Sequence, residues 1–475
     1  MRALRLRHCI FAWTIFGLGF VKPATERIQD TDVWWHIKTG ELIVRTGAIP
    51  RSDPFSFTCL GHPWVAHEWL SEVIIYSVFA RLGFIGLMLM EAALVCGLLL
   101  AIYALVRRNL ENQAGALAIT ALCGFAGWQL WSPRPQLFTY ILVALLLLIL
   151  GRGARSPSIW LLIPIFALWS NLHGAWLFGL VVMTLVLGEE AIRATNTRAA
   201  FVCVLCALSV LIGPSPIARF IYPIQYFTGG IPTAQVMEFQ SPNFRDPSTL
   251  PFEILMLCVV GVLLLGRRPM RVSQWVLLIL TAHMSLSSVR HIPLFAIVSA
   301  PILGMQVQAA LERRRPSAGE HGRESPLLNL VLLLILPALL ISRMPRVNDE
   351  AHCTATKLYP SGACRFLADN PRIGRGRLLN TYNWGGYLIF KLHPKYLISI
   401  DGRADIHRAH MMRDYEALEN LSPSWELVLR ERNPDVILWP AKKPLATILR
   451  RDPRWRVIYQ DATAVIFTRR SLHVP

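Results

Sequence analysis

Long apolar runs recur along roughly the first two thirds of this chain and constrain its fold more than any other feature. Many of them approach the roughly 20 residues that a helix needs to cross a bilayer. Of the 475 residues, 53% are hydrophobic and only 16% are charged, whereas about 25% of the residues in a soluble domain are charged. A soluble core built from so many apolar helices would lack the polar surface to cover it. We therefore predict an α-helical polytopic membrane protein.

The distribution of basic residues predicts how the chain crosses the membrane. Cytoplasmic loops carry an excess of Lys and Arg, and Arg2, Arg5 and Arg7 precede the first apolar run. If residues 64–81 form a helix on the membrane surface, every clear Arg cluster between spans falls on the cytoplasmic side. This arrangement predicts a cytoplasmic N-terminus and about eleven spans, near residues 8–22, 84–106, 114–131, 136–150, 158–170, 175–190, 199–212, 251–266, 272–287, 291–310 and 326–342.

The net charge of +18 fits this orientation pattern better than it fits nucleic-acid binding. Much of the excess lies in short loops between apolar runs, as the positive-inside rule requires. The sequence has neither a G-x-x-x-x-G-K-[ST] phosphate loop nor a zinc-type pair of Cys-x-x-Cys motifs. We therefore expect a lipid bilayer, and no nucleic acid, among the partners.

Residues 345–475 differ from the rest of the chain, because short β-rich runs replace the long apolar ones. Helical or turn-rich stretches alternate with the first four runs, which is typical of a small α/β domain. The topology places this domain outside the membrane, where Cys353 and Cys364 form either a disulfide or two free thiols. We predict a membrane domain over 1–344, a first outer loop at 23–83 with two interfacial helices, and an α/β domain over 345–475 with strands near 378–382, 396–400, 435–439, 455–459 and 464–468.

An acidic motif, Asp30-Thr31-Asp32, follows the first span. We expect a helix over 31–46, ended by Gly47, on which Asp32 and His36 share a face because they are four residues apart. In one interpretation the acids cap an interfacial helix whose tryptophans anchor it at the membrane surface. In the other, they are a catalytic base or a pair of metal-binding carboxylates.

The second expected helix of the first outer loop, 64–81, begins with His67, Glu68 and Glu72. Glu68 and Glu72 are four residues apart, and like charges at that spacing repel each other. A metal ion, a basic partner or a raised pKa would relieve the repulsion. The alternative is a solvated polar face.

Basic residues stand at the mouths of three pairs of predicted spans, all on the outer side. Arg134 lies between two prolines, His173 follows Asn171, and Arg290 and His291 form the third group. Charged groups at such depth are costly and suggest function, although each alone is also explained by snorkelling to the interface. Because they share the outer side with the acids, they suggest an anionic leaving group such as a phosphate.

In the α/β domain, Asp401-Gly402-Arg403 stands out. Asp401 ends a predicted strand, which is where α/β sheets usually place ligand-binding groups. The alternative is a simple turn, because Asp-Gly is common turn chemistry.

Together these features resemble the GT-C superfamily of membrane glycosyltransferases, which use polyprenyl-phosphate-linked sugars. The acidic motif with His36 and Gly40 is similar to the first-loop motif of protein O-mannosyltransferases and their bacterial relatives that transfer aminoarabinose to lipid A. The mannosyltransferases have an Asp-Glu pair instead. The chain also resembles uncharacterised bacterial proteins of this type over nearly its whole length, through Trp35-His36, 53–58, 63–70, Arg134 to Gln136, 171–174, Arg290-His291, 384–387 and 401–403.

The resemblance implies a hexosyl or pentosyl transferase in the inner membrane of a prokaryotic cell. It would move a sugar from a polyprenyl-phosphate-linked donor to a glycan, lipid or protein acceptor outside the membrane. A carboxylate would act as the base, with Asp32 as the first candidate and Asp30 as the second. A divalent metal, Mg²⁺ or Mn²⁺, if used, would be held by these two acids. The other expected site residues are His36 and Glu68 for catalysis, and Arg134, His173, Arg290, His291, His67, Asp401 and Arg403 for substrate binding.

Two other functions are kept as alternatives. A transporter or flippase of lipid-linked glycan needs a polar path through the bilayer, but charges inside the predicted spans are few, with Glu91 the clearest. A non-catalytic envelope assembly protein would use residues 345–475 to bind a partner and would tolerate substitution of the acids.

Overall fold

The computed structural model describes residues 5–26, 28–227, 236–266, 268–313, 326–347, 358–370, 373, 376–407 and 409–470. The chain divides into two compact units. The first, which we call the helical unit, consists of residues 1–26, 85–220 and 236–347. The second, the sheet unit, consists of residues 27–84, 221–235 and 348–475.

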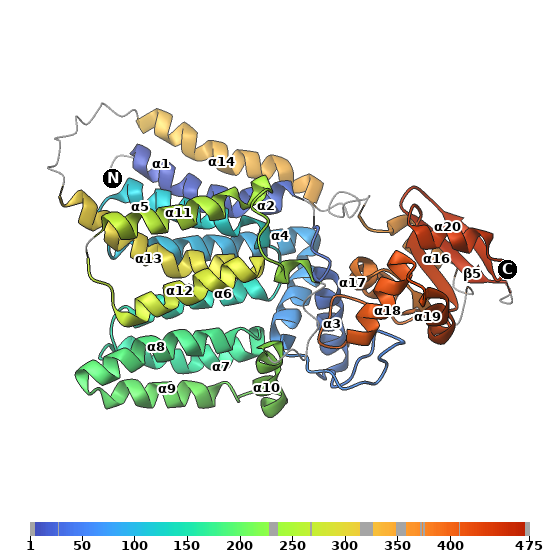
Figure 1. The fold of residues 1–475 in the computed structure, drawn as a ribbon. Coiled ribbons are helices and arrows are strands. Elements are labelled where there is room, and N and C mark those ends of the chain that lie inside the picture. Colours follow the sequence, from blue (N-terminus) through green and yellow to red (C-terminus); the bar gives the residue numbers. More distant parts are fainter. Residues whose placement is uncertain are drawn as a thin grey trace. The chain divides into compact units, whose positions relative to one another are not determined.

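Apolar helices that lie side by side build the helical unit (Figure 1). Its central helix is α13 (Ile292–Leu311), which is buried around most of its circumference and packs against four other helices. The unit's other elements are α1 (Leu6–Ala12), η1 (Trp13–Gly17), α2 (Leu18–Thr25), the second part of α4 (Trp69–Arg107), α5 (Gln113–Gly127), η2 (Trp128–Leu130), α6 (Gln136–Leu150), η3 (Pro157–Leu161), α7 (Leu162–Leu172), α8 (Trp176–Ala194), α9 (Thr197–Ser209), the start of α10 (Pro216–Phe227), η4 (Met237–Phe239), η5 (Pro247–Thr249), α11 (Leu250–Leu265), α12 (Val272–Ser287), η6 (Val289–His291) and α14 (Pro326–Val347).

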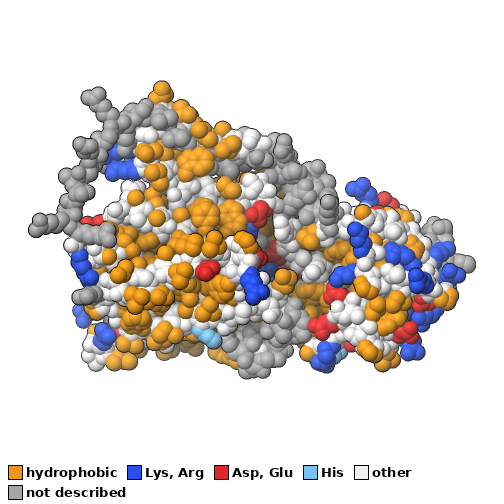
Figure 2. All heavy atoms as spheres, turned by 45° about the horizontal axis from the view of Figure 1, so that its top comes forward, with side chains coloured by type: hydrophobic (Ala, Val, Ile, Leu, Met, Phe, Trp, Pro, Cys, Tyr) orange, Lys and Arg blue, Asp and Glu red, His pale blue; other side chains and the backbone are white. Residues whose placement is uncertain are grey.

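The surface of the helical unit is that of a membrane protein. Hydrophobic side chains cover much of its visible face (Figure 2), and Leu257 and Leu264 expose 64% and 79% of their area. Among the described residues, three helices are long and apolar enough to cross a bilayer: Trp69–Arg107, Pro247–Leu265 and Val289–Leu311. The predicted class is therefore confirmed, whereas the count of about eleven spans remains a prediction.

The first predicted helix of the outer loop is present as α3 (Val33–Thr46). It ends at Gly47, whose left-handed conformation (φ 66°) is the one that glycine adopts most easily at a helix end. The expected anchoring of its tryptophans at the membrane surface is wrong. Trp34 is fully buried among the rings of Tyr359, Tyr387 and Phe390, at centroid distances of 5.2 to 5.5 Å.

The second predicted helix begins at Trp69 instead of residue 64. Residues 62–64 instead pair in antiparallel fashion with residues 51–53, because Asp53 N–H donates to His62 O and Trp64 N–H donates to Arg51 O, both at 2.9 Å. The helix then continues as α4 to Arg107, across a non-helical Gly83 (φ 61°, ψ −146°). That break coincides with the boundary between the two units, and with the predicted start of the second span at residue 84.

All five predicted strands are present in one sheet with the order β2-β1-β3-β5-β4. The pairs β1–β2 and β1–β3 are parallel, whereas β3–β5 and β4–β5 are antiparallel. Cys364 is buried in α16, but Cys353 lies outside the described residues, so their pairing remains untested. The elements are α16 (Ser361–Asp369), β1 (Arg377–Leu379), η7 (Tyr382–Trp384), α17 (Gly385–Leu392), β2 (Leu397–Ile398), α18 (Ala409–Asn420), α19 (Trp425–Arg432), β3 (Val436–Pro440), α20 (Pro444–Arg451), β4 (Trp455–Gln460) and β5 (Ala464–Arg469).

Part of the first outer loop pairs with the edge of this sheet. Ile398 N–H donates to Phe55 O at 3.0 Å, and Phe57 N–H donates to Ile398 O at 2.9 Å. In addition, α3 packs against α17 so closely that a Cβ on Gly386 would lie 2.3 Å from the Thr31 carbonyl oxygen. The structure thus joins most of the loop 23–83 to the C-terminal residues, whereas the sequence-based division assigned it to residues 1–344.

Candidate active site

Asp32 stands at the N-cap position of α3, but its side chain makes no capping hydrogen bond. Instead, Trp35 Nε1–H donates to Asp32 Oδ1 at 3.1 Å. The neighbouring acid, Asp30, accepts a hydrogen bond from Asp32 N–H through Oδ1 at 3.0 Å. The two carboxylates therefore differ in role: Asp30 stabilises the start of the helix, while the Asp32 carboxylate is oriented by an indole.

Gly402 lies directly against the Asp32 carboxylate. A Cβ built on this glycine would be 1.9 Å from Asp32 Oδ1 and 3.4 Å from Trp35 Nε1. No side chain fits there without moving the carboxylate. The acidic motif and the Asp401-Gly402-Arg403 motif, which the sequence suggested separately, therefore meet at one place in the sheet unit.

His36 lies between the two glutamates of the second helix. His36 Nδ1 is 3.3 Å from Glu72 Oε1, and His36 Nε2 is 3.9 Å from Glu68 Oε2. The imidazole ring also contacts the Trp35 ring in a tilted arrangement, with centroids 3.6 Å apart. A basic partner was one of the features expected to relieve the repulsion between Glu68 and Glu72, and His36 lies in that position.

Glu72 is almost completely buried, and no hydrogen-bond partner is found for its Oε2 atom among the described residues. A close approach of helices encloses it, because Gly40 of α3 lies against the Glu72 backbone, where a Cβ would be 2.1 Å from the Glu72 carbonyl oxygen. Within the described ranges, no group of three or more His, Cys, Asp or Glu side chains is arranged to hold a metal ion. The metal suggested for Asp30 and Asp32 remains a prediction.

His67 and Asp405 extend this acidic region. His67 Nε2 is 3.6 Å from Glu68 Oε1, and its ring stacks on Tyr222 at 3.8 Å. Burial lowers the pKa of His67, but Glu68 and Asp405 outweigh burial, so the pKa lies above its ordinary value. Burial raises the pKa of Asp405, despite the opposing effects of His67 and Arg403. The raised pKa values mean that both groups hold a proton to a higher pH than usual.

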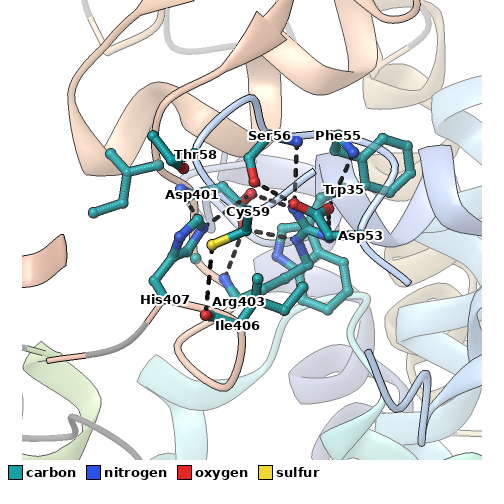
Figure 3. Close-up of polar contacts among 12 residues, drawn as sticks. Trp35, Asp53, Phe55, Ser56, Thr58, Cys59, Asp401, Arg403, Ile406 and His407 are labelled. Atoms are coloured by element: carbon teal, nitrogen blue, oxygen red, sulfur yellow. Dashed lines mark hydrogen bonds and ion pairs between the residues drawn. The ribbon is translucent and has the colours of Figure 1, made fainter. Parts of the chain in front are cut away.

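Arg403 is fully buried and holds two segments of the sheet unit together (Figure 3). Its Nε and Nη2 atoms donate to the two oxygens of Asp401, at 2.9 and 2.6 Å. Its Nη1 atom donates to Asp53 Oδ1 at 2.8 Å. Asp53 in turn accepts from the backbone of Phe55 and Ser56. The guanidinium thus ties the turn 53–56 to the loop that carries Gly402.

The charges in this network stabilise one another. Burial would raise the pKa of Asp401, but Arg403 and His407 together hold it well below its usual range. Burial would lower the pKa of Arg403, but Asp401 and Asp53 raise it further above its usual value. Asp401 and Arg403 were expected to bind substrate. With no exposed surface on Arg403, we interpret both as residues that position the Asp32 site.

His407 makes the network sensitive to alkaline pH. Its Nε2 atom accepts from Asp401 N–H at 3.1 Å when the imidazole is neutral and lies 3.3 Å from Asp401 Oδ2, to which the protonated Nε2 can donate. Burial lowers the pKa of His407, but Asp401 raises it to about 9, above the unfolded value of about 6.5. Stability from the protonated imidazole is therefore fully present below pH 6.5 and is lost as the pH rises toward 9.

We expect the midpoint temperature of unfolding to fall between pH 6.5 and 9, through a loss on the order of 3 kcal/mol. In His407→Gln the same pH range should change the midpoint much less, because no imidazole titrates. Differential scanning fluorimetry of both proteins checks this. Parallel pH curves for the two proteins would contradict the assignment.

In the helical unit, Glu238 bridges two of the predicted arginines. Arg134 Nη2 is 2.9 Å from Glu238 Oε2, and Arg290 Nη1 is 3.6 Å from Glu238 Oε1. Arg290 also lies over the Phe239 ring, at 4.4 Å from its centroid. Burial would raise the pKa of Glu238, but Arg134 and Arg290 lower it to about 2. Glu238 is therefore an anion at neutral pH.

The predicted His173 is oriented by a chain of hydrogen bonds. Trp169 Nε1–H donates to Thr139 Oγ1 at 2.9 Å, which directs the hydroxyl proton to His173 Nδ1 at 2.8 Å. Ala175 N–H also points to Nδ1, at 3.3 Å. Because Nδ1 accepts, neutral His173 carries its proton on Nε2 and is a donor there. The predicted His291 contacts the Met284 carbonyl oxygen, at 3.3 Å.

Sequence reasoning missed five of the residues of these sites: Glu238, Tyr222, Arg219, Asp405 and His407. Glu238 and Asp246 are the only acids in residues 213–250, and this rarity was the available signal. Tyr222 and Arg219 belong to α10, in a loop where no helix was expected. Arg219 is buried and donates to Asn171 Oδ1 at 2.9 Å, and so supports the turn that carries His173.

Comparison with solved structures shows the fold. The arabinofuranosyltransferase AftD from Mycobacteria matches 98% of this chain, with a TM-score of 0.51 and 13% identity, and the match covers 39% of that protein. A structure of a mutant of the same enzyme matches 98%, with a TM-score of 0.56 and 13% identity, and covers 41% of it. The chain therefore spans about two fifths of the length of AftD and shares the fold of that part.

A third match is the oligosaccharyltransferase of Archaeoglobus fulgidus, at 10% identity, covering 97% of this chain and 73% of that one. Its TM-score of 0.48 is too low to support a fold assignment. No protein-family model and no curated protein sequence matches the chain.

Proposed function

We propose that this chain is a membrane glycosyltransferase of the GT-C type, which transfers a sugar from a polyprenyl-phosphate-linked donor to an acceptor outside the membrane. The observation that carries the proposal is the Asp32 carboxylate, held by Trp35 Nε1–H and enclosed by Gly402, in a chain that shares the fold of an arabinofuranosyltransferase over 98% of its length. Because AftD is an arabinofuranosyltransferase, the shared fold also favours glycosyl transfer over transport.

In this proposal Asp32 is the general base. It takes the proton from an acceptor hydroxyl while the hydroxyl oxygen forms a bond to the anomeric carbon of the sugar. The bond between that carbon and the phosphate oxygen breaks, and polyprenyl phosphate leaves with the electron pair. Trp35 and Gly402 fix the orientation of the Asp32 carboxylate. The Asp401–Arg403–Asp53 network keeps Gly402 in place.

We assign a second task to the helical unit. Arg134 and Arg290 are proposed to bind the phosphate of the donor lipid, and His173 to donate a hydrogen bond to it through Nε2. Guanidinium groups suit this role because their planar N–H groups match two phosphate oxygens at once. The proposed orientation places the N-terminus in the cytoplasm and residues 345–475 outside the inner membrane of a prokaryotic cell.

Release of polyprenyl phosphate tests the proposal. We expect the purified protein, in nanodiscs with a radiolabelled polyprenyl-phosphate-linked sugar and an envelope extract as acceptor, to release free polyprenyl phosphate over time. A flippase would move the intact donor between leaflets without breaking the bond. Movement of intact donor with no release would therefore favour the transporter alternative and count against a transferase.

A further inference from the structure

Glu238 occupies the place where the two proposed phosphate-binding arginines converge. Each carboxylate oxygen faces a different guanidinium, at 2.9 Å from Arg134 and 3.6 Å from Arg290. The three side chains are largely buried, with exposed fractions of 10%, 20% and 21% for Arg134, Arg290 and Glu238. A carboxylate and a phosphate present similar oxygens to a guanidinium, so both fit such a pair.

We infer that Glu238 is an internal substitute for a phosphate group, which fills the Arg134–Arg290 anion site and leaves it when a phosphate ligand binds. This inference rests on the proposed function, because it names the polyprenyl monophosphate product as the ligand. In this role Glu238 is neither a base nor a permanent phosphate contact, but competes with phosphate for the two arginines.

Charge explains why the carboxylate and the phosphate exclude each other. Two arginines supply a charge of +2, and Glu238 leaves a net charge of +1. A phosphate monoester carries about −1.5 to −2 at pH 7. If Glu238 stayed, about −2.5 to −3 would face two arginines in a largely desolvated site, and the like charges would repel each other. If it leaves, the charges of the site and the ligand nearly cancel.

The backbone around Glu238 is anchored, so the exchange requires only a side-chain movement. Ser288 Oγ donates to Glu238 O at 2.8 Å, and Val289 N–H donates to Gln240 O at 3.0 Å. Phe239 remains packed on Arg290. In the absence of ligand, the Glu238 carboxylate is a counter-ion that both guanidinium groups share, which keeps the arginines in place for the phosphate.

Direct binding measurements on Glu238→Gln test the inference. The full-length protein in nanodiscs is titrated with a polyprenyl monophosphate, with inorganic phosphate, and with the uncharged polyprenol. We expect the variant to bind the phosphate ligands about tenfold more tightly than the native chain, a change of about 1.4 kcal/mol. Adding Arg134→Gln to this variant should abolish the gain.

The matched control is Glu312→Gln. Glu312 also pairs with an arginine of the helical unit, Arg268, at 2.8 Å, but both side chains are exposed by more than 40%. This control should not change the affinity for any of the three ligands. If inorganic phosphate shares the gain, the site recognises the phosphate group itself; if only the lipid does, the chain of the lipid is also required. Both results support the inference.

Unchanged or weaker binding of polyprenyl monophosphate by Glu238→Gln overturns the inference, as does an equal gain for uncharged polyprenol. Because binding is measured without turnover, the two proposals fail separately. If Glu238→Gln binds lipid phosphate more tightly but the native protein never releases polyprenyl phosphate, the inference about Glu238 stands and the transferase proposal fails. If the native protein is an active transferase but Glu238→Gln binds lipid phosphate no more tightly, the transferase proposal stands and the inference about Glu238 fails.

Discussion

Replacing Asp32 with asparagine should reduce sugar transfer at least about 100-fold, which is the lower end of what a general base contributes. The substitution keeps the shape of the side chain. The oxygen of the new side-chain amide can still accept from Trp35 Nε1–H and still fits beside Gly402, so helix α3 should be unaffected. The measurement is the initial rate of polyprenyl phosphate release by the purified variant in nanodiscs.

Three further variants separate a base from a structural acid. Asp369→Asn, an exposed acid of the same unit, should leave the rate unchanged. Asp30→Asn keeps an acceptor for Asp32 N–H and should cost much less than Asp32→Asn. Gly402→Ala should impair transfer without removing an acid, because its Cβ would displace the Asp32 carboxylate. Near-normal transfer by Asp32→Asn would reject this residue as the base, and selective loss in Asp30→Asn would move the role to Asp30.

Local patterns were sufficient to predict the elements of the fold. The five β-rich runs and the helix that ends at Gly47 all lie where the sequence indicated, because side-chain alternation and a C-terminal glycine are local signals. The start of α4 was misplaced by five residues, since backbone hydrogen bonds to Arg51 and Asp53, rather than helix propensity, hold the preceding residues. Helix α10 lay in a proline-rich loop whose composition concealed it.

The site was only partly predictable, because its contacts join distant residues. The sequence indicated Asp32, His36, Glu68 and the arginines by residue type. It gave no sign that Trp34 would be covered by Tyr359 and Tyr387, more than 300 positions away, so an interfacial role was inferred wrongly. The salt bridge between Asp53 and Arg403, which are 350 positions apart, was equally hidden. A single sequence reports charge and periodicity but not which charges meet.

The Arg403 network leads to the largest expected effect on stability. In Arg403→Met, the buried Asp53 and Asp401 would lose the guanidinium that both contact, and only Asp401 would keep a basic neighbour, His407; such a loss typically costs about 3–5 kcal/mol. We expect faster hydrogen exchange of β2 and of the paired residues 55–57, measured by mass spectrometry on the full chain. Sugar transfer should fall as well, because the loop that holds Gly402 against Asp32 would lose its anchor.

The chain contains a matched control for this prediction. Arg454 contacts Asp452 with the same geometry as Arg403 and Asp401, two residues apart, with Nε–Oδ1 at 2.9 Å and Nη2–Oδ2 at 2.6 Å in both pairs. Arg454, however, is 53% exposed. Arg454→Met should therefore cost less than about 1 kcal/mol. Adding Asp53→Asn and Asp401→Asn to Arg403→Met should recover part of the protection, because uncompensated buried charge is the main cost. Equal hydrogen-exchange rates in Arg403→Met and Arg454→Met would show that burial does not strengthen the Arg403 salt bridges. A triple variant less protected than Arg403→Met would show that lost hydrogen bonds, rather than uncompensated charge, destabilise the loop.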